Sequence, residues 1–272
     1  MSTENRNPII TEEVNLFYTK GIYSFFCKNI AKLFCLVLSI LKSITDPFNP
    51  GIDSIEYFRL VSCLWIVNHN ANKLQGISSI SSSVHDNLFC KCRQAIVDCI
   101  CAFCYAYNQQ SYQTGLKEHN ILNGIILRNI LIPVEMFKGL AILFPYLRIE
   151  SFGDVANVIQ ARNYIRIIKA FPEKRCAIWS KNKNIWKQAF AIESKPDNCT
   201  YVHSSSELNK EDYIDREEYS FIDHTFTVYT KKYIREHNIV INCGGRKCME
   251  CIIKGINCYY RNTEFSIREQ KK

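Results

Sequence analysis

Apolar residues recur along this chain in two rhythms, one typical of buried strands and one typical of amphipathic helices. Short apolar or β-branched runs predict a strand-like element at 76–81 and further strands at 146–151, 176–180, 199–204, 224–230 and 239–242. Between these runs, residues 156–171 and 184–190 carry apolar side chains at helical spacing. Strands that alternate with helices predict an α/β fold whose sheet is parallel, either open or rolled into a barrel.

The first part of the chain is helical in pattern and contains the most hydrophobic segment, residues 21–44. A membrane-spanning helix needs about twenty consecutive apolar residues, whereas Lys28, Asn29 and Lys32 interrupt this segment. We therefore expect no transmembrane segment. An amphipathic or buried helix is favoured over contact of residues 21–44 with a membrane surface.

Two more helical stretches and two changes of composition complete the outline. The prolines in 46–51 end the first helix, and 53–67 predicts a second one. A long helical stretch is expected over 111–144, with a break at Pro133. The chain thus divides into three parts. Residues 1–68 form an N-terminal helical extension, 69–242 a β/α barrel-like domain with the first cysteines, and 243–272 a C-terminal cysteine-rich, metal-binding segment.

Composition and charge narrow the class of protein only modestly. Of the 272 residues, 47% are hydrophobic and 22% are charged, which is typical of a globular protein. The formal net charge of +8 favours a polyanionic partner, but the basic residues are spread along the chain, so nucleic acid is only weakly supported. The first twenty residues are polar and acidic where a secretory signal is apolar, which predicts a cytoplasmic location.

Fourteen cysteines are many for this length, and most of them cluster. The first cysteine group is Cys90, Cys92, Cys99, Cys101 and Cys104, and the second cysteine group is Cys243, Cys248, Cys251 and Cys258. In a reducing compartment clustered thiols are ligands rather than disulfides, and we favour iron-sulfur clusters over zinc. The other cysteines stand singly beside apolar residues and are expected in the core: Cys27, Cys35, Cys63, Cys176 and Cys199.

Polar residues follow each predicted strand, at the end where parallel α/β folds bind ligands. Glu150 lies within a predicted strand, where a buried carboxylate needs a partner, and Gly153 would let the backbone approach a bound group closely. With Asp154, Lys181 and Asn182 they form the candidate cofactor-binding set. The alternatives are ordinary surface loops and, for the two carboxylates, an ion pair with Arg148, Arg162 or Arg166.

The sequence contains few other signals of a catalytic or ligand-binding site. The six histidines show no spacing typical of a metal pair, so hydrogen-bonded structural histidines are expected, His203 at a strand end being the most notable. The chain has no G-x-S-x-G elbow, P-loop, dinucleotide-binding glycine fingerprint or H-E-x-x-H motif. The cysteine groups therefore carry the functional argument.

Several pieces of the chain agree in order and spacing with a known family. They are NKLQGISSIS at 72–81, NLFC and ICAFCYAY around the first cysteine group, LRIESFGD at 147–154, AIWSKN at 177–182 and CGGRKCMECIIKGINCY at 243–259. Through these pieces, about seven-tenths of the chain resembles the phage and prophage gene product 88 domain family. The resemblance implies architecture more than activity.

The same pieces are similar to the radical S-adenosylmethionine scaffold, a partial β/α barrel with a three-cysteine cluster after its first strand. The sequence C-A-F-C at 101–104 is similar to the end of that family's motif. The scaffold expects its first cysteine at Val97, and this chain offers instead Cys90, Cys92 or Cys99. We choose Cys90, because the family resemblance places a cysteine after the NLF run.

The scaffold resemblance implies a partial (β/α) barrel of about six mostly parallel strands. It implies that Cys90, Cys101 and Cys104 hold a 4Fe-4S cluster that binds S-adenosylmethionine. Glu150 and Asp154 would then position amino or ribose groups of this cofactor, while Lys181 and Asn182 would face the substrate.

The second cysteine group has the C-x4-C-x2-C spacing of plant-type ferredoxins, with a fourth cysteine nearby. Four thiolates suit an auxiliary cluster, and they suit zinc equally well. Our leading interpretation is a cytoplasmic iron-sulfur protein of phage type that acts as a radical enzyme on an unknown substrate. The alternative is a zinc-stabilised nucleic-acid-binding protein without catalytic activity.

Overall fold

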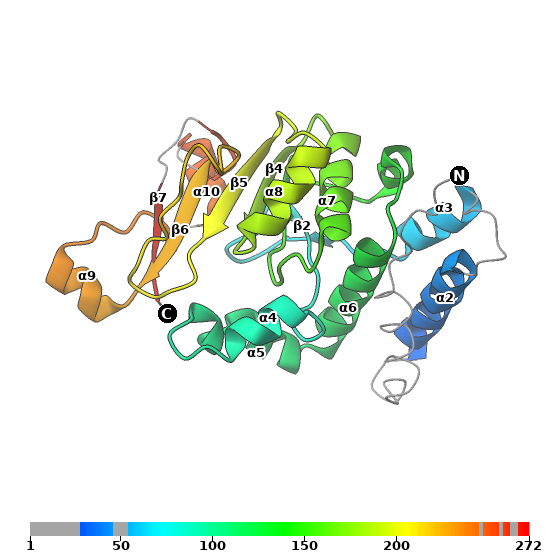
Figure 1. The fold of residues 1–272 in the computed structure, drawn as a ribbon, viewed down its shortest axis with the longest axis horizontal. Helices are drawn as coiled ribbons and strands as arrows, with labels where there is room; N and C mark the ends of the chain where they lie inside the picture. The colour runs from blue at the N-terminus through cyan, green and yellow to red at the C-terminus, as the bar shows by residue number, and fades with distance from the viewer. Residues whose placement is uncertain (1–27, 46–53, 245–246, 256–257, 262–265, 272) are drawn as a thin grey trace.

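The strand-forming runs assemble into one sheet whose spatial order equals the order of its strands in the chain. The computed structural model describes residues 28–45, 54–244, 247–255, 258–261 and 266–271. The strands are β1 (Val67–Asn68), β2 (Ile77–Ile80), β3 (Tyr146–Ile149), β4 (Arg175–Ser180), β5 (Cys199–Ser204), β6 (His224–Tyr229) and β7 (Ser266–Gln270). β1 is antiparallel to β2 and every later pair is parallel. The predicted α/β class with a mostly parallel sheet is confirmed, and among the described residues the sheet is open (Figure 1).

One predicted strand is wrong, whereas the others match β2 to β6 to within two residues. Residues 239–242 are irregular, because Asn238 ends the preceding helix in the left-handed conformation with φ of 52°, and Val240 is 71% exposed. The place beside β6 belongs to β7 instead. The end of the segment contacts β7 through hydrogen bonds, among them those from the N–H groups of Asn242 and Cys243 to the Arg268 carbonyl, at 3.2 and 3.0 Å.

The helices follow the predicted rhythm less closely than the strands. They are α2 (Lys28–Thr45), α3 (Ser54–Ser62), α4 (Leu88–Gln94), α5 (Tyr105–Tyr112), α6 (Thr114–Asn129), α7 (Val158–Ala170), α8 (Lys183–Ile192), α9 (Lys231–His237) and α10 (Cys248–Ile253), with 3-10 turns η2 (Ile100–Phe103) and η3 (Val134–Gly139). The helical stretch predicted over 111–144, with a break at Pro133, is present in part. α6 gives way to extended chain at Ile130, ahead of the predicted break, and the short turn η3 begins after Pro133.

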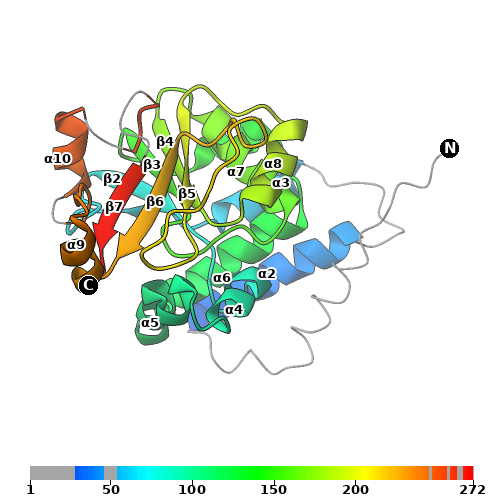
Figure 2. The same cartoon turned by 60° about the vertical axis from the view of Figure 1, so that its left-hand side comes forward.

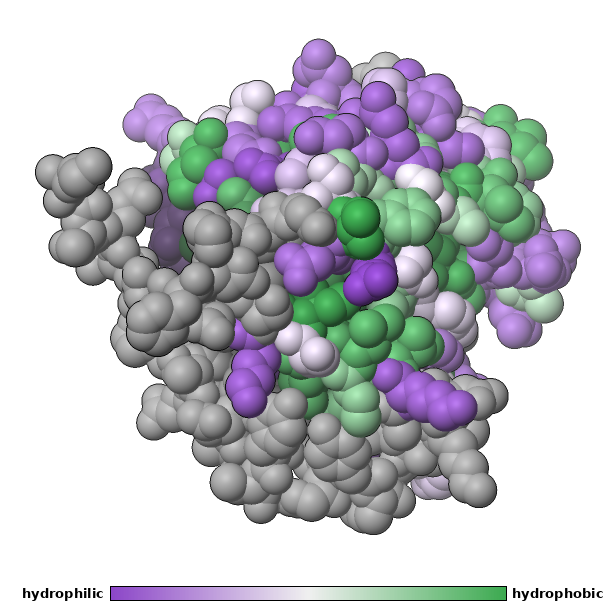
Figure 3. All heavy atoms as spheres, turned by 90° about the vertical axis from the view of Figure 1, so that its right-hand side faces the viewer, coloured by the Kyte–Doolittle hydropathy of each residue, from purple (hydrophilic) through white to green (hydrophobic). Residues whose placement is uncertain are grey.

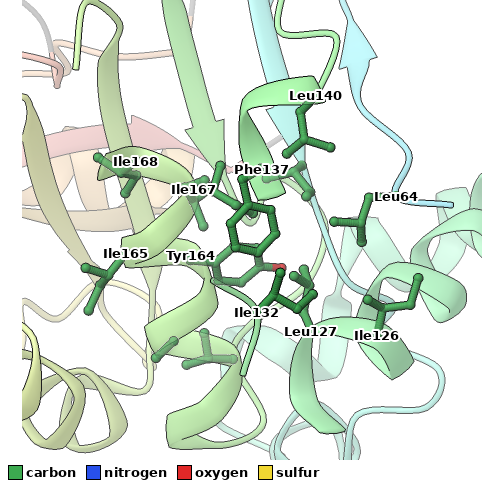
Figure 4. Packing of buried hydrophobic residues seen from close by; sticks show 14 of the residues in the cluster. Leu64, Ile126, Leu127, Ile132, Phe137, Leu140, Tyr164, Ile165, Ile167 and Ile168 are labelled. Atoms are coloured by element: carbon green, nitrogen blue, oxygen red, sulfur yellow. The ribbon is translucent and has the colours of Figure 1, made fainter. Parts of the chain in front are cut away.

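One face of the sheet, here called the outer face, lies beneath α6, α7 and α8 (Figure 1). Alternate residues of a strand point the same way, and Leu147, Ile178 and Tyr201 enter the large core on this side. α7 supplies Tyr164 and Ile168 to the same core, where its side chains interlock with those of α6 and η3 (Figure 4). Each fully buried aliphatic or aromatic side chain contributes about 1.5–3 kcal/mol, so this core anchors the sheet.

The N-terminal helices share that core. α2 is amphipathic as predicted, with Leu38 buried among the core residues, and Leu60 of α3 joins them. Residues 21–27 of the predicted helix lie outside the described residues. Apolar side chains also gather on the surface of this side of the molecule (Figure 3). Ile55 and Phe58 of α3 are exposed. None of the described helices combines the length and the apolar composition that crossing a bilayer requires.

The opposite face of the sheet, here called the inner face, is covered near the amino ends of its strands by the C-terminal segment. Ile77 and Ala177 pack there with Ile252 and Tyr259, and α10 lies on the side of the sheet away from α7 and α8 (Figure 2). The Lys73 ammonium pairs with the Glu269 carboxylate at 2.9 Å. This ion pair links the β1–β2 turn to β7, so the segment joins the first and last parts of the sheet.

Candidate metal centres

The first cysteine group lies across the carboxyl ends of the strands. α4 follows β2 closely, and the next residues reach the loop after β5, where the Ile100 N–H donates to the Ser206 carbonyl at 2.8 Å. Cys99 and Glu207 form an isolated antiparallel bridge at the same place. α4 and α5 therefore lie beyond this end of the sheet (Figure 1). Parallel α/β folds bind their ligands at this end.

Asn87 fixes the start of α4 against the loop after β3. Its side-chain oxygen accepts hydrogen bonds from the N–H groups of Phe89 and Cys90, at 3.0 and 3.4 Å, which makes it the N-cap of the helix. Its amide nitrogen donates to the Asp154 carbonyl at 2.6 Å. Because Asn87 is 1% exposed, both bonds are shielded from water, and they hold Cys90 close to the end of β3.

Two of the three predicted ligands of the first cysteine group lie in one small cluster, and the described side chains of the group are not arranged to chelate a metal ion. Cys90 is buried with Val84 and Ala106, and Cys104 packs against this small cluster. Burial raises the pKa of the Cys90 thiol well above its usual value, and the charges of Asp154, Glu150, Cys101 and Cys104 raise it further. Burial likewise raises the pKa of Cys101 to about 12, against the lowering effect of the Lys181 ammonium.

The two other candidates for the third ligand differ in position. Cys92 is exposed on α4. Cys99 is buried beside Cys101, whose N–H donates to the Cys99 sulfur at 3.4 Å. Val97, where the scaffold expects its first cysteine, is 83% exposed. Cys104 packs against the cluster that contains Cys90, and the assignment of Cys90 as the third ligand stays a prediction.

Glu150 follows β3 directly and is fully enclosed by hydrogen-bond donors. Its carboxylate accepts from the Ser82 N–H at 3.0 Å, the Ser82 hydroxyl at 2.7 Å, Gln160 at 3.1 Å and the Tyr164 hydroxyl at 2.6 Å. The predicted alternative of an ion pair with arginine is wrong here, since these neutral donors occupy the carboxylate. Its φ of 58° is left-handed, a strained conformation for a glutamate. Glu150 thus ties the loop after β2 to β3 and α7.

Asp154 connects the loop after β3 to the end of β4 in a similar way. Its carboxylate accepts hydrogen bonds from the Ser180 hydroxyl, from the Val155 N–H at 2.8 Å and from the Lys181 N–H at 2.7 Å. The Lys181 ammonium reaches the Ser204 hydroxyl at 2.7 Å. The Asn182 side chain donates to the Val155 carbonyl at 3.4 Å. The predicted cofactor-binding residues therefore lie together, but their described contacts are with one another and with the loops.

Gly153 is needed for close packing inside the protein. A Cβ atom there would lie 2.5 Å from the Ser82 carbonyl oxygen and 2.7 Å from a Glu150 carboxylate oxygen. The sequence predicts that the backbone at Gly153 approaches a bound group closely. In the structure it approaches these two residues instead. Glycine lets the loop after β3 lie against the loop after β2.

The substitution Gly153→Ala should lower the free energy of unfolding by about 1–3 kcal/mol, because backbone must shift to admit the methyl group. Gly139→Ala is the matched control, since no atom of the described residues lies within 4 Å of its Cβ position. Urea unfolding of the two variants measures the difference. Equal stability of both variants would contradict the described packing.

The Glu150 carboxyl should make stability depend on pH. Burial raises its pKa from 4.5 to about 7, although the bonds from Tyr164 and Ser82 lower it. Between these values the folded protein binds more protons than the unfolded chain, so stability falls as pH rises through this window. The loss attributable to Glu150 is on the order of 3 kcal/mol.

Urea unfolding of the native protein and of Glu150→Gln at pH 5 and pH 8 tests this prediction. The native protein should be less stable at pH 8, and the variant should show a smaller difference. Because burial also raises the pKa of Asp154, only the difference between the two proteins is attributed to Glu150. An identical pH dependence of both proteins would contradict the account.

The second cysteine group lies on the inner face. Cys248 and Cys258 pack against the small core formed there by α10 and the sheet. The Cys248 N–H donates to the Lys73 carbonyl at 2.8 Å, and the Cys258 carbonyl accepts from the Thr200 hydroxyl at 2.5 Å. Cys243 forms an isolated parallel bridge with Glu269. These contacts connect Cys248 to the β1–β2 turn, Cys258 to β5 and Cys243 to β7.

Electrostatic effects connect the four thiols of the second cysteine group. Burial raises the pKa of Cys258 to about 12, with Arg148 lowering it and Cys248 and Cys243 raising it. Burial also raises the pKa of Cys248, to which Cys251 adds. Among the described residues, no three His, Cys, Asp or Glu side chains are arranged to chelate a metal ion. Metal binding would therefore require deprotonation and a closer approach of the sulfur atoms.

His203 and the single cysteines are the remaining residues of interest in the sequence. The His203 imidazole pairs with the Asp212 carboxylate at 2.9 Å, as expected of a hydrogen-bonded structural histidine. Three single cysteines are buried as predicted, namely Cys63, Cys176 and Cys199. Cys35 is exposed, so its predicted place in the core is wrong. Cys27 lies outside the described residues.

Sequence reasoning missed the residues that hold the site in place. Asn87 could have been found, because an asparagine before a helical run is a typical N-cap. Gln160 and Tyr164 are four residues apart on one helix and reach the same carboxylate. Ser82 gives no signal, since it is one of several consecutive serines.

Comparison of this chain with protein-family models, with curated proteins and with solved structures found no match. The resemblance to the gene product 88 family and to the radical S-adenosylmethionine scaffold therefore stays a prediction. Any functional conclusion has to come from the two cysteine groups and their surroundings.

Proposed function

We propose that this protein binds iron-sulfur clusters through both cysteine groups and acts as a radical S-adenosylmethionine-like enzyme of phage or prophage type. Cys90, Cys101 and Cys104 would hold the reactive cluster, and the second cysteine group would hold an auxiliary one. The observation that supports the proposal is the packing of Cys104 against Cys90 beyond the carboxyl ends of the strands, with Cys101 three residues before Cys104. These thiols come from two helical turns separated by an exposed loop, and they are the ones chosen from sequence.

The strand order supports a partial (β/α) barrel. β2 to β7 are parallel and adjacent in chain order, and α6, α7 and α8 lie on one face, as right-handed crossovers between the earlier strands require. The other face must then be concave or covered. The C-terminal segment lies on that face, and the Lys73–Glu269 ion pair links the ends of the sheet.

The chemistry of the first cysteine group fits a cluster with one open iron. Cys90, Cys101 and Cys104 would hold such a cluster, and the chemistry that it would supply, once an external reductant has reduced it, is cleavage of bound S-adenosylmethionine. In this chain burial raises the pKa of Cys101 to about 12 and the Lys181 ammonium acts against that rise, so cluster binding would have to drive deprotonation of the thiol. Glu150 and Asp154 would act by holding the loops, since donors within the protein occupy both carboxylates.

Iron and acid-labile sulfide in anaerobically purified protein test the first centre. The native protein should be brown and contain both elements, because iron-bound thiolates absorb visible light. Cys90→Ser and Cys101→Ser should each lose the iron of one cluster. Cys92→Ser is the matched control, since Cys92 lies on the same helix as Cys90 but is exposed, and it should keep full iron content. Equal iron in the Cys90 and Cys92 variants would contradict the assignment.

Cleavage of S-adenosylmethionine by the reduced, iron-loaded protein tests the enzymatic part of the proposal. We expect cleavage by the native protein and none by Cys101→Ser. A brown protein that leaves S-adenosylmethionine intact would rule out the radical enzyme and leave a role in electron transfer or sensing.

The rival function, a zinc protein that binds nucleic acid, rests on the positive net charge. Several basic side chains are already paired in the fold: Arg162 and Arg166 both bond to Glu193, and Arg128 bonds to Asp86 at 2.8 Å. Such pairing reduces the charge that is free to neutralise phosphates. A colourless protein that contains zinc and binds DNA with steep salt dependence would favour this rival.

A further inference from the structure

Two cations on the inner face stand apart from the ion pairs that hold the fold. Arg148 of β3 is in register with Ala177 of β4, so the two side chains point to the same face. Because side chains alternate along a strand, Trp179 lies on this face too, and the alternation extended past the end of β4 adds Lys181. Within the described part of the chain, no carboxylate lies within 4.0 Å of either cation, whereas the buried Arg128 pairs with Asp86. Arg148 and Lys181 thus present positive charge that the described fold does not neutralise.

The Arg148 guanidinium is held in a defined orientation. It lies over the Trp179 ring, with 4.1 Å from its central carbon to the ring centroid. Stacking of this kind occupies the face of the guanidinium and leaves its in-plane N–H donors available. Its Nε atom is shielded from solvent and has no hydrogen-bond partner among the described residues, and the same holds for Nε1 of Trp179. Buried donors of this kind are costly unless a ligand satisfies them.

The surroundings add aromatic surface and a second donor. Phe226 of β6 meets Trp179 edge-on, with ring centroids 4.9 Å apart, and both side chains are only half-buried. The Lys181 ammonium bonds to the Ser204 hydroxyl at 2.7 Å, and Ser204 is in register with Phe226. Cations and half-exposed aromatic rings therefore share one stretch of the inner face, between the two cysteine groups.

We propose that this stretch is a binding site for an anionic ligand with a planar apolar portion, its carboxylate or phosphate held by Arg148 and Lys181. An arginine fork matches the two oxygens of such a group, and Trp179 and Phe226 offer apolar contact to the rest of the ligand. The proposal rests on these side chains and holds whether or not the cysteine groups bind iron.

Quenching of tryptophan fluorescence by 4-nitrobenzoate tests the site, with 4-nitrobenzamide as the uncharged counterpart of the same shape. The native protein should bind 4-nitrobenzoate saturably, and Trp179→Phe should lose that signal. Arg148→Gln should weaken binding by about tenfold or more, since a charge-assisted hydrogen bond is lost. Lys181→Gln should weaken it less. Equal binding of the amide and the acid would overturn the proposal.

Arg175→Gln is the matched control. Arg175 also lies on β4 and over an aromatic ring, that of Tyr260 at 5.2 Å, but at the other end of the strand. The control should bind 4-nitrobenzoate with unchanged affinity. An unchanged affinity of both Arg148→Gln and Lys181→Gln, or a loss in Arg175→Gln equal to that in Arg148→Gln, would overturn the proposal. Thermal unfolding checks that each variant is folded.

The second cysteine group is the competing source of negative charge, because Cys248 and Cys258 also face Arg148. The titration is therefore repeated on protein freed of metal by a chelator and on iron-loaded protein. Binding in both forms supports the site. Loss of binding on iron loading would assign Arg148 to the metal thiolates and overturn the proposal. Absence of iron uptake, with binding intact, would count against the proposed function alone.

Discussion

Two buried carboxylates hold the carboxyl ends of the sheet together. Each would be costly to bury without partners, and each accepts several hydrogen bonds from neighbouring loops. Glu150 ties the loop after β2 to α7, and Asp154 ties the loop after β3 to the end of β4. Because the Asp154 carbonyl also accepts the bond from Asn87, the position of Cys90 depends on this network.

The two cysteine groups are organised by different physical means. The first is positioned by hydrogen bonds among buried polar groups, which impose direction and leave little freedom. The second is gathered mainly by apolar packing, with Cys248 and Cys258 beside Ile252 and Tyr259. A polar network is sensitive to the charge of its carboxylates, whereas an apolar cluster is sensitive to volume. The first centre should therefore respond to pH and the second to core substitutions.

The sequence was most informative where local pattern and tertiary structure agree. The buried strands β3 to β6 read directly as apolar or β-branched runs, because strands of a parallel sheet are covered on both faces. Residues 239–242 have the same composition but lie at the surface, so their pattern was misleading. The break at Ile130 depends on how the chain must turn toward β3. No single run of residues records that requirement.

The candidate site was predicted in its residue types and only partly in its roles. Clustered cysteines are visible in any sequence, and of the three predicted ligands Cys90 and Cys104 pack in one cluster. The role of Glu150 was not visible, since Ser82 lies 68 positions before it in the chain. Arg148 was considered only as an ion-pair partner, because register across strands, which sets it beside Trp179, is known only from the fold.

The most direct test of the central claim is native mass spectrometry of the whole chain, purified without oxygen. The account predicts a mass above that of the bare chain by two iron-sulfur clusters, one at each cysteine group. A mass equal to that of the bare chain, or an increment of zinc ions without sulfide, would contradict it.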